Sequence, residues 1–448
     1  MSENKIIENR TLVLIKNALL DGEKRDLFIE NGRIKKIAKK IVEPNIAALL
    51  EQPDLIRTEV IDAGGKLTLL PAFVDIHAHL REPGFEGKED IKTGLEAAVN
   101  GGYAAVCCMP NTNPVIDNEY IIRYICDRAN SLNLAKLYPI GAITRGMDGQ
   151  LLADFGKMRD AGAVAVSDDG KPVANANMMR LAMEYAKDFD MPVTSHCEDI
   201  SLVDEGVANE GYHATLSGLK GITRAAEEVN VAREIVLADA LNTGVHIAHV
   251  STKGAARLVR DAKRSGIRVT AETCPHYFAA TDKLILNYDT NAKVNPPLRT
   301  EEDRLAIIEA LKDGTIDAIA TDHAPHQKSD KACEFNFAAN GISGIETAYA
   351  LSYTYLVKSG AITLKKLSEL MTDNPAKIFK LEAGKLEAGA LANLVLVDNS
   401  AEYKIDKNKF LSKGKNTPFH GLTVTGQVVY TIVAGKIVKR NGVVAGHE

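Results

Sequence analysis

Residues 69–84, LLPAFVDIHAHLREPG, contain an apolar run that ends in two histidines, His77 and His79. The run at 69–74 predicts a buried strand, because unbroken apolar residues are typical of strands covered on both faces. Side chains alternate between the two faces of a strand, so residues two apart point the same way. Two imidazoles on one face can hold a divalent metal ion from a rigid support. A bare H-x-H pair is equally compatible with two ordinary polar residues at a strand end.

This strand is the first of eight apolar runs that alternate with helical patterns. The predicted strands span residues 72–79, 104–109, 136–143, 163–168, 191–198, 244–250, 268–274 and 318–323. The helices predicted between them include residues 88–100, 118–129, 178–188, 223–240, 252–265 and 301–312. An eightfold alternation predicts an α/β fold of the (β/α)₈ barrel type, which needs ~250 residues plus insertions. An open doubly wound sheet is the alternative, but no G-x-G-x-x-G motif follows the first strand.

Both ends of the chain carry short strand-like segments instead of this alternation. They span residues 11–16, 24–30, 33–38 and 59–62 at one end, and 393–398, 423–427, 429–433 and 436–439 at the other. A fragment of two or three strands is marginally stable alone, so we expect both ends to pair into one small β domain beside the barrel. Two independent flanking pieces are the alternative. The expected boundaries are 1–70 and 389–448 for the β domain and 71–388 for the barrel.

The composition of the 448-residue chain is that of a soluble globular protein, with 45% hydrophobic and 25% charged residues. The formal net charge of −5 argues against nucleic acid as the main partner. We expect no signal peptide, and no apolar run reaches the ~18 residues that a membrane span needs. The six cysteines form no C-x-x-C pair, so we expect reduced, mostly buried thiols in a cytoplasmic protein.

Histidines and carboxylates stand at the C-terminal ends of several predicted strands, which is where barrel enzymes place their sites. A lone histidine is more often structural, but independent structural roles have no reason to share one rim of a barrel. Four histidines and two aspartates are enough for two Zn²⁺-type ions with a carboxylate between them. The candidate ligands are His77, His79, the SDDG segment at 167–170, His196, His249 and Asp322.

Two such ions would lie ~3.5–4 Å apart and share a hydroxide, because metal binding lowers the pKa of its parent water toward ~7. That hydroxide attacks a carbonyl carbon polarised by one metal, and a nearby carboxylate carries its proton to the leaving nitrogen. Asp322 suits this role, since it can bind a metal and still face the substrate. The expected first ion is held by His77, His79 and Asp322, and the second by His196 and His249.

The order of these residues along the strands resembles the amidohydrolase superfamily and, within it, the class I dihydroorotases. The resemblance runs from about residue 11 to residue 440 and includes the DIHAHLREPG, MPNT, SDDG, SHCED, AHVS, NPPLR and ATDHAPH motifs, at 75–84, 109–112, 167–170, 195–199, 248–251, 295–299 and 320–326. It implies reversible ring closure of N-carbamoyl-L-aspartate to L-dihydroorotate, with loss of water, in de novo pyrimidine (UMP) synthesis. It also implies a composite β domain beside the barrel.

The bridge between the two ions needs an acidic group from the fourth strand. The resemblance assigns it to Asp169, leaving Asp168 as a supporting residue and giving two Zn²⁺ ions bridged by Asp169 and hydroxide. Many members of the superfamily use a carbamylated lysine instead. Lys171 is therefore a rival bridge, but it follows Gly170 and is expected to lie beyond the strand.

A substrate carboxylate is expected to bind Arg81, two positions beyond His79, because a guanidinium pairs with a carboxylate bidentately. Asn111, at the end of the second strand, can add amide hydrogen bonds. The resemblance extends the substrate contacts to His79, Asn295, His326 and the backbone at Asn340 and Gly341.

The stretch 327–340 has charge and little apolar periodicity, so we expect a mobile loop that closes over the substrate. Its end, FAANG at 337–341, departs from the Pro-Phe-Gly of relatives. His323 is expected to support this loop instead of binding metal.

Two rival functions remain open from the residues. Dihydropyrimidinases, hydantoinases and allantoinases resemble the same barrel and metal site, but their neutral-ring substrates would leave a buried Arg81 without a partner. The other rival is a non-catalytic dihydroorotase-like partner of aspartate carbamoyltransferase, which need not keep metal ligands. We expect a homodimer that acts on a small molecule, and association with aspartate carbamoyltransferase stays open.

Overall fold

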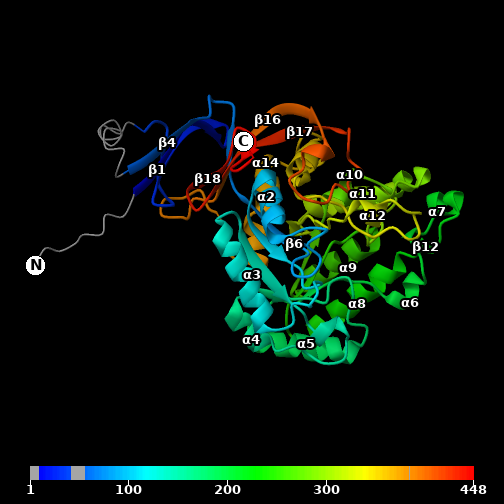
Figure 1. Ribbon diagram of the computed structural model, residues 1–448. Coiled ribbons are helices and arrows are strands. Elements are labelled where there is room, and N and C mark those ends of the chain that lie inside the picture. The colour runs from blue at the N-terminus through cyan, green and yellow to red at the C-terminus, as the bar shows by residue number, and fades with distance from the viewer. Residues whose placement is uncertain (1–9, 42–55, 383, 448) are drawn as a thin grey trace, which may run out of the picture.

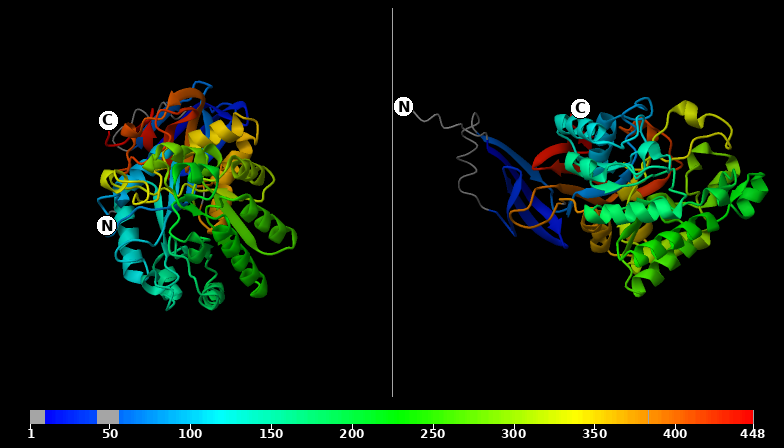
Figure 2. Two further views of the ribbon diagram at one scale, coloured as in Figure 1. Left: turned by 90° about the vertical axis from the view of Figure 1, so that its right-hand side faces the viewer. Right: turned by 90° about the horizontal axis from the view of Figure 1, so that it is seen from below.

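The computed structural model describes residues 10–41, 56–382 and 384–447. Figure 1 shows a barrel ringed by helices, with a sheet beside it that contains both blue strands from the N-terminal end and orange to red strands from the C-terminal end. The right-hand view in Figure 2 shows the blue N-terminal strands projecting to one side of the helices that surround the barrel. In the part of the chain that the structure describes, no helix has the length and apolar character that a membrane crossing requires.

The barrel contains all eight predicted strands, in parallel order around its axis. They are β6 Phe73–Ala78, β7 Tyr103–Cys108, β8 Lys136–Gly141, β9 Ala165–Val166, β10 Thr194–Ser195, β13 Val245–Ile247, β14 Val269–Thr273 and β15 Ala318–Ile319. They form two four-stranded sheets, β6-β7-β8-β9 and β10-β13-β14-β15. Bridges between Val166 and Val193 and between Ala78 and His323 join the two sheets and close the barrel. The predicted (β/α)₈ fold is therefore confirmed.

Several barrel strands are shorter than predicted because the backbone turns away just before the predicted ligands. His249 and Asp322 have positive φ angles of 35° and 43°, so neither continues the strand that precedes it. A non-glycine residue rarely adopts such a conformation, and it is often found at functional sites. The predicted strands therefore include the ligands, whereas the regular pairing ends before them.

An irregularity in β6 decides which way the two leading histidines point. Val74 and Ile76 pack in the cluster inside the barrel, which by simple alternation would turn His77 and His79 outward. The register against β7 shifts before Ala78, where β6 holds an extra residue, and Ala78 packs in the outer core instead. The two histidines consequently face the barrel interior.

Helices cover the outside of the barrel, and all six predicted helices are present. The longer ones are α2 Ile91–Gly101, α3 Glu119–Leu132, α4 Phe155–Ala161, α5 Ala176–Asp188, α8 Ala225–Ala240, α9 Lys253–Arg264, α11 Glu301–Lys312 and α14 Leu364–Met371. The shorter ones are α6 Ile200–Val203, α7 Tyr212–Ser217, α10 Pro275–Ala279, α12 Lys328–Lys331, α13 Ala348–Ser352 and α15 Asp373–Ile378. A small parallel pair, β11 Ala208–Asn209 and β12 Gly221–Ile222, lies outside the barrel. Among the described helices, capping boxes begin α2 at Asp90, α11 at Thr300 and α12 at Gln327.

The β domain combines strands from both ends of the chain in one sheet. Its order is β19-β18-β17-β16-β5-β1-β2-β3, with β4 also paired to β1. β5 is the junction, because Leu70 pairs with Val395 of β16 while Thr68 pairs with Leu19 of β1. The strands are β1 Arg10–Leu20, β2 Glu23–Glu30, β3 Arg33–Ala38, β4 Ile56–Asp62, β5 Thr68–Pro71, β16 Leu394–Lys404, β17 Thr423–Val433, β18 Lys436–Arg440 and β19 Val443–Val444. The composite domain is confirmed.

Two strands of this domain differ from the prediction. The apolar run at 69–74, predicted as one buried strand, is divided between β5 of this sheet and β6 of the barrel. The segments 423–427 and 429–433 form a single strand, β17. Its register against β16 shifts by one residue between Val428 and Tyr430, which marks a β-bulge. The bulge breaks the alternation along β17, so the sequence suggests two strands.

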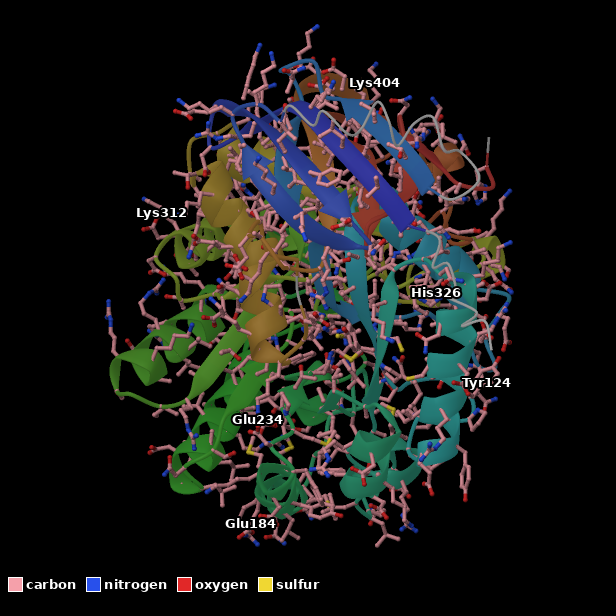
Figure 3. The ribbon with its side chains drawn as sticks, turned by 90° about the vertical axis from the view of Figure 1, so that its left-hand side faces the viewer. Tyr124, Glu184, Glu234, Lys312, His326 and Lys404 are labelled. Atoms are coloured by element: carbon pink, nitrogen blue, oxygen red, sulfur yellow. The ribbon has the colours of Figure 1, made fainter. Side chains whose placement is uncertain are left out.

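Figure 3 views the molecule from the β-domain side, with Lys404 of β16 at one end of the view and Glu184 of α5 at the other.

We propose the domain boundaries 1–70, 71–388 and 389–448, which the position of β5 and β16 supports. The β domain and the barrel nevertheless share part of one hydrophobic core. Val395, Val397 and Val428 of the β domain lie in the same hydrophobic cluster as the outer core of the barrel. The C-terminal strands therefore stabilise the barrel as well as their own sheet.

Candidate metal centre

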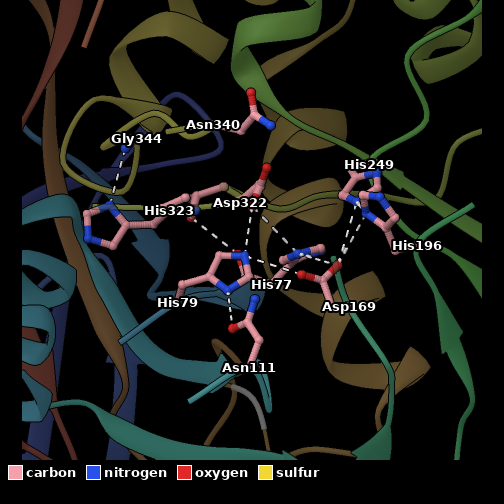
Figure 4. Close-up of polar contacts among 12 residues, drawn as sticks. His77, His79, Asn111, Asp169, His196, His249, Asp322, His323, Asn340 and Gly344 are labelled. Carbon is pink, nitrogen blue, oxygen red and sulfur yellow. Dashed lines mark hydrogen bonds and ion pairs between the residues drawn. The ribbon is translucent and has the colours of Figure 1, made fainter. Parts of the chain in front are cut away.

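Four predicted ligands meet at the C-terminal rim of the barrel (Figure 4). Nε2 of His77 lies 3.4 Å from Asp169 Oδ1 and 3.6 Å from Asp322 Oδ1. Nε2 of His79 lies 3.5 Å from Asp169 Oδ2 and 3.1 Å from Asp322 Oδ1. A tetrahedral ion with bonds of ~2.1 Å sets its ligand atoms about 3.4 Å apart, so these separations suit one shared cation.

A second group shares Asp169 with the first. Nδ1 of His196 lies 3.6 Å from Asp169 Oδ1, and Nε2 of His249 lies 3.7 Å from the same oxygen. The two imidazole nitrogens are 2.7 Å apart. In each of the two trios, His77–His79–Asp169 and Asp169–His196–His249, the ligand atoms lie within 4.8 Å of one another. Asp169 is therefore the only described residue that belongs to both trios.

The ligand atoms are buried, and two of them have no hydrogen-bond partner. The side chains of His77, Asp169, His196 and His249 are all buried, and His77 Nε2 and Asp169 Oδ1 are unpaired. An unpaired buried polar group costs about 1–3 kcal/mol, and a cation between these atoms would remove that cost. Burial alone would raise the pKa of Asp169, but the facing imidazoles hold it well below its ordinary value. The donor set fits a binuclear metal site.

Outer hydrogen bonds direct each imidazole toward the centre. Nδ1–H of His77 donates to Glu272 Oε1 over 2.7 Å, and Nδ1–H of His79 donates to Asn111 Oδ1 over 2.9 Å. In both rings this leaves Nε2 free to face the aspartates. Burial would raise the pKa of the Glu272 carboxyl, but His77 lowers it to about 2. Glu272 was not predicted, although its place in the seventh strand, beside the ligand rim, is a signal that could have identified it.

The fourth strand places its two aspartates in different roles. Asp168 Oδ1 accepts hydrogen bonds from the backbone N–H of Ile143 and Thr144, at 2.8 and 3.1 Å. Burial raises the pKa of Asp168 to about 6, against the hydrogen bonds from Thr144. The geometry thus supports the interpretation of Asp168 as a supporting residue. Lys171, the alternative candidate for bridging the two metal ions, is exposed and does not lie among the ligands.

The first and eighth strands are tied together beside the centre. Asp75 accepts hydrogen bonds from the backbone N–H and the hydroxyl of Thr321, at 3.0 and 2.5 Å. Thr321 precedes Asp322, and Asp75 also accepts from the backbone N–H of His77 at 3.2 Å. This carboxylate was not predicted, and it sets the two neighbouring ligands relative to each other.

The residues expected to bind the substrate gather beside the metal ligands. Nε of Arg81 donates to the carbonyl of Pro325 over 3.2 Å, and Nη2 lies 3.4 Å from His326 Nε2. His326 Nε2 lies 2.8 Å from the carbonyl of Asn340, to which it donates. Gly341 has a φ of 143°, and a Cβ there would lie 2.7 Å from the carbonyl oxygen of Ala324. A side chain at Gly341 would therefore displace the backbone on this side of the mouth, by which we mean the open C-terminal end of the barrel.

Asn295 hydrogen-bonds to a carboxylate that contacts the second metal trio. Its Nδ2 donates to Glu198 Oε2 over 3.0 Å, and the same oxygen lies 3.3 Å from Nε2 of His196. This contact leaves Nδ1 of His196 to face Asp169. Asn295 Oδ1 is buried without a hydrogen-bond partner, so it can accept from a bound molecule.

The stretch 327–341 is more ordered than its sequence suggests. It contains the short helix α12, and Nζ of the buried Lys331 donates to the carbonyls of Thr290, Lys293 and Ala339 at 3.0, 3.1 and 2.6 Å. Burial lowers the pKa of Lys331 to about 7. The spacing of apolar residues carries no information about hydrogen bonds between an ammonium group and backbone carbonyls. The sequence alone therefore predicts a mobile loop here.

His323 supports the adjoining segment, as expected. Its Nδ1 accepts from the backbone N–H of Gly344 over 3.2 Å (Figure 4), and its Nε2 faces Glu89 at 3.5 Å.

The six cysteines are all free, and four of them are buried, namely Cys107, Cys108, Cys197 and Cys274. This agrees with the expectation of reduced thiols.

Comparisons with known proteins agree with the geometry. The Dihydro-orotase-like family model matches residues 65–255, and the Amidohydrolase family model matches residues 221–439. A dihydroorotase from Acetivibrio thermocellus is 50% identical over 418 residues, which is 93% of this chain and 95% of the relative. One from a Thermoanaerobacter species is 51% identical over 430 residues, or 95% of this chain and 96% of the relative.

Solved structures with the same fold are also found. The L-hydantoinase (dihydropyrimidinase) from Arthrobacter aurescens superimposes with a TM-score of 0.85 at 25% identity and covers 97% of each chain. A D-hydantoinase has a TM-score of 0.82 at 22% identity, over 98% of this chain and 97% of its own, and this second likeness shows the fold alone. Taken with the near-full-length relatives, these matches establish that the chain belongs to the dihydroorotase family of the amidohydrolase superfamily.

Proposed function

We propose that the chain catalyses the reversible ring closure of N-carbamoyl-L-aspartate to L-dihydroorotate, with loss of water, in pyrimidine synthesis. The family and the paired metal trios support a cyclic amide hydrolase. The observation that carries the substrate assignment is Arg81. Its guanidinium contacts His326 and the carbonyl of Pro325, and among the described residues no acidic side chain forms an ion pair with it.

The charge of Arg81 is the physical reason for an acidic substrate. Burial lowers its pKa to about 10, against the attraction of Asp322 and Asp169, so the guanidinium stays charged at neutral pH. A partly buried charge without a partner is costly, and a substrate carboxylate would supply that partner. Hydantoin and dihydrouracil rings have no carboxylate to offer.

The proposed ligands divide between two ions. His77, His79, Asp169 and Asp322 would hold the first, and Asp169, His196 and His249 the second. Zn²⁺ is the proposed metal, because imidazole nitrogens and carboxylate oxygens are among its common ligands. When bound, two such ions supply an acidified water and polarise the reacting carbonyl group.

Asp322 is proposed to move the proton. In the direction of ring opening, its carboxylate accepts a proton from the attacking water and delivers it to the ring nitrogen that leaves. In the direction of ring closure, the same group takes the proton from that nitrogen and returns it to the departing water. Burial would raise the pKa of Asp322, but the contact with Nε2 of His79 and the nearby imidazoles lower it, so the carboxylate is ionised and ready to accept.

The remaining residues would orient the substrate. Arg81 and the imidazole of His326, 3.4 Å apart, are placed to share the carboxylate that stays outside the reacting bond. Asn111 and Asn295 offer amide groups from the segments that follow the second and the seventh strands. His79, beside Asp322, and the backbone at Asn340 and Gly341 complete the proposed contacts.

Turnover of three ring compounds by the zinc-loaded protein tests this function. Dihydroorotate should be opened much faster than hydantoin or dihydrouracil. Faster opening of hydantoin would assign the chain to the neutral-ring enzymes. Absence of both metal and turnover would favour a non-catalytic partner of aspartate carbamoyltransferase, a reading that the complete ligand set disfavours. The cytoplasmic location and the homodimer stay predictions.

A further inference from the structure

A segment after the barrel, far along the chain from the metal ligands, reaches the substrate side of the mouth. Residues 410–417, which we call the C-terminal strap, lie between β16 and β17 of the β domain. The strap contributes no metal ligand and contains none of the predicted substrate contacts. One of its side chains nevertheless bonds directly to the backbone of two of those contacts.

That side chain is Asn416. It is 3% exposed, and its Nδ2 donates to the carbonyls of Ala324 and Gly341 at 3.0 and 2.9 Å. Its Oδ1 accepts from the backbone N–H of His326 and from the hydroxyl of Ser343, both at 2.9 Å. An asparagine amide has two N–H donors and two acceptor positions, and all four are used here.

These bonds connect two segments that are separate in the sequence. His326 follows the eighth barrel strand, whereas Gly341 ends the stretch 327–341. The imidazole of His326 already contacts the carbonyl of Asn340 at 2.8 Å. Asn416 bonds to the backbone N–H of His326 and to the carbonyl of Gly341. A residue of a third segment, the C-terminal strap, therefore fixes the separation between His326 and Gly341. Removing Asn416 would leave two buried carbonyls and one N–H without these partners, and each such loss is costly.

The rest of the strap is fixed firmly against the barrel. Glu346 accepts from the backbone N–H of Leu411 and Ser412 at 2.9 and 3.1 Å. The hydroxyl of Ser412 donates to Glu89, the carboxylate that faces His323. At Gly414 there is no room for a side chain, because a Cβ would clash with Pro325. The strap therefore presents Asn416 from a rigid support.

We infer that Asn416 is a positioning residue for the substrate site, holding His326 and Gly341 at the spacing that the substrate requires. The inference rests on the proposed function, which assigns substrate contacts to those two residues. It makes the C-terminal strap a working part of the catalytic mouth, although none of its side chains belongs to the metal centre.

The test compares Asn416→Ala and Asn416→Asp with Asn408→Ala in the full-length, zinc-loaded protein. The aspartate variant keeps the shape of the side chain but turns an oxygen toward the two carbonyls. Asn408 is an exposed asparagine of the same connection that bonds only to Asp406 among the described residues, so it is the matched control. The readouts are KM and kcat for dihydroorotate, zinc content, and hydrogen–deuterium exchange of peptides within residues 324–343.

Both Asn416 variants should raise KM on the order of tenfold, because misplaced binding groups weaken the ground state and the transition state together. The value of kcat should stay within about threefold and the zinc content should not change. Exchange within residues 324–343 should rise. Asn408→Ala should match the wild type in all four readouts.

An unchanged KM in a folded Asn416 variant would overturn the inference, and so would unchanged exchange within residues 324–343. Loss of stability with normal KM would assign Asn416 to the fold alone and overturn it as well. If neither variant folds, Ser343→Ala, which removes one of the four bonds, should raise KM by about twofold or more, and a normal KM there would decide against the inference. A wild-type protein without dihydroorotate turnover would instead refute the proposed function.

Discussion

Glu272 accepts a 2.7 Å hydrogen bond from Nδ1 of His77, on the side of the imidazole that faces away from the aspartates. Both side chains are buried. The same carboxylate lies 3.2 Å from Nε2 of His246, so it stands between two imidazoles. The bond fixes the tautomer of His77 and leaves Nε2 to face Asp169 and Asp322. The metal centre therefore depends on a residue outside its ligand set.

Glu272→Gln should weaken zinc binding by about 10–100-fold, which is typical for loss of a group that orients a metal-binding histidine. Competition with a zinc chelator would measure the affinity. Glu302→Gln, on the exposed start of α11, is the matched control and should leave the affinity unchanged. Wild-type zinc affinity in Glu272→Gln would contradict the orienting role.

Asp322→Asn should lower kcat for dihydroorotate by about 10²–10⁴-fold, because the amide cannot accept the proton of the attacking water. The second trio lacks Asp322, so zinc held by Asp169, His196 and His249 should remain. Metal analysis together with steady-state kinetics would separate the two effects. Substantial turnover in the variant would assign the proton transfer to another group.

Arg81→Met should raise KM for dihydroorotate on the order of 10²-fold, since a hydrogen bond to a charged group contributes about 1.5–3 kcal/mol. Zinc content should be unaffected, because Arg81 contacts His326 and Pro325 and not the metal ligands. Arg123→Met, an exposed arginine on α3, provides the control. A KM close to that of the wild type would remove the main reason for an acidic substrate.

Lys439 gives the stability a predictable pH dependence. Its Nζ donates to the carbonyl of Asn100, in the last turn of α2, and burial lowers its pKa to about 8 from the ordinary 10.5. Between these two values the unfolded chain binds the extra proton, so raising the pH favours the folded state. The free energy of unfolding should gain about 2 kcal/mol from this group between pH 8 and pH 10.

Urea unfolding of the wild type and of Lys439→Met at both pH values would measure that contribution. The advantage of the wild type over the variant should grow with pH. Lys436→Met, on the exposed edge of the same strand, should show no such trend. Equal pH slopes in wild type and Lys439→Met would mean that the buried amine keeps its ordinary pKa.

The barrel could be predicted from its sequence because each strand is an apolar run followed by a helical pattern. The ligand rim could be predicted for a related reason, since the carboxyl ends of parallel strands meet at one edge. The direction of His77 could not be derived from alternation alone. It depends on an extra residue in β6 that becomes visible only when β6 is paired with β7. The bulge in β17 had the same effect on the predicted strands of the β domain.

Residues that act across long distances in the chain were the ones that the sequence did not reveal. Glu272 is 195 positions from His77, and Asn416 is 90 positions from His326. Neither has a local pattern that marks it, because its role comes from which segments the fold brings together. The same holds for Lys331, whose three carbonyl partners turn a polar stretch into an ordered one.

The central claim is that Asp169 bridges two metal ions at the carboxyl ends of the barrel strands. An anomalous difference map at the zinc edge, from a crystal of the zinc-loaded protein, tests it most directly. The account predicts two peaks ~3.5–4 Å apart, one beside His77 and His79 and the other beside His196 and His249, with a carboxylate oxygen of Asp169 on each. A single peak, or two peaks without Asp169 between them, would contradict it.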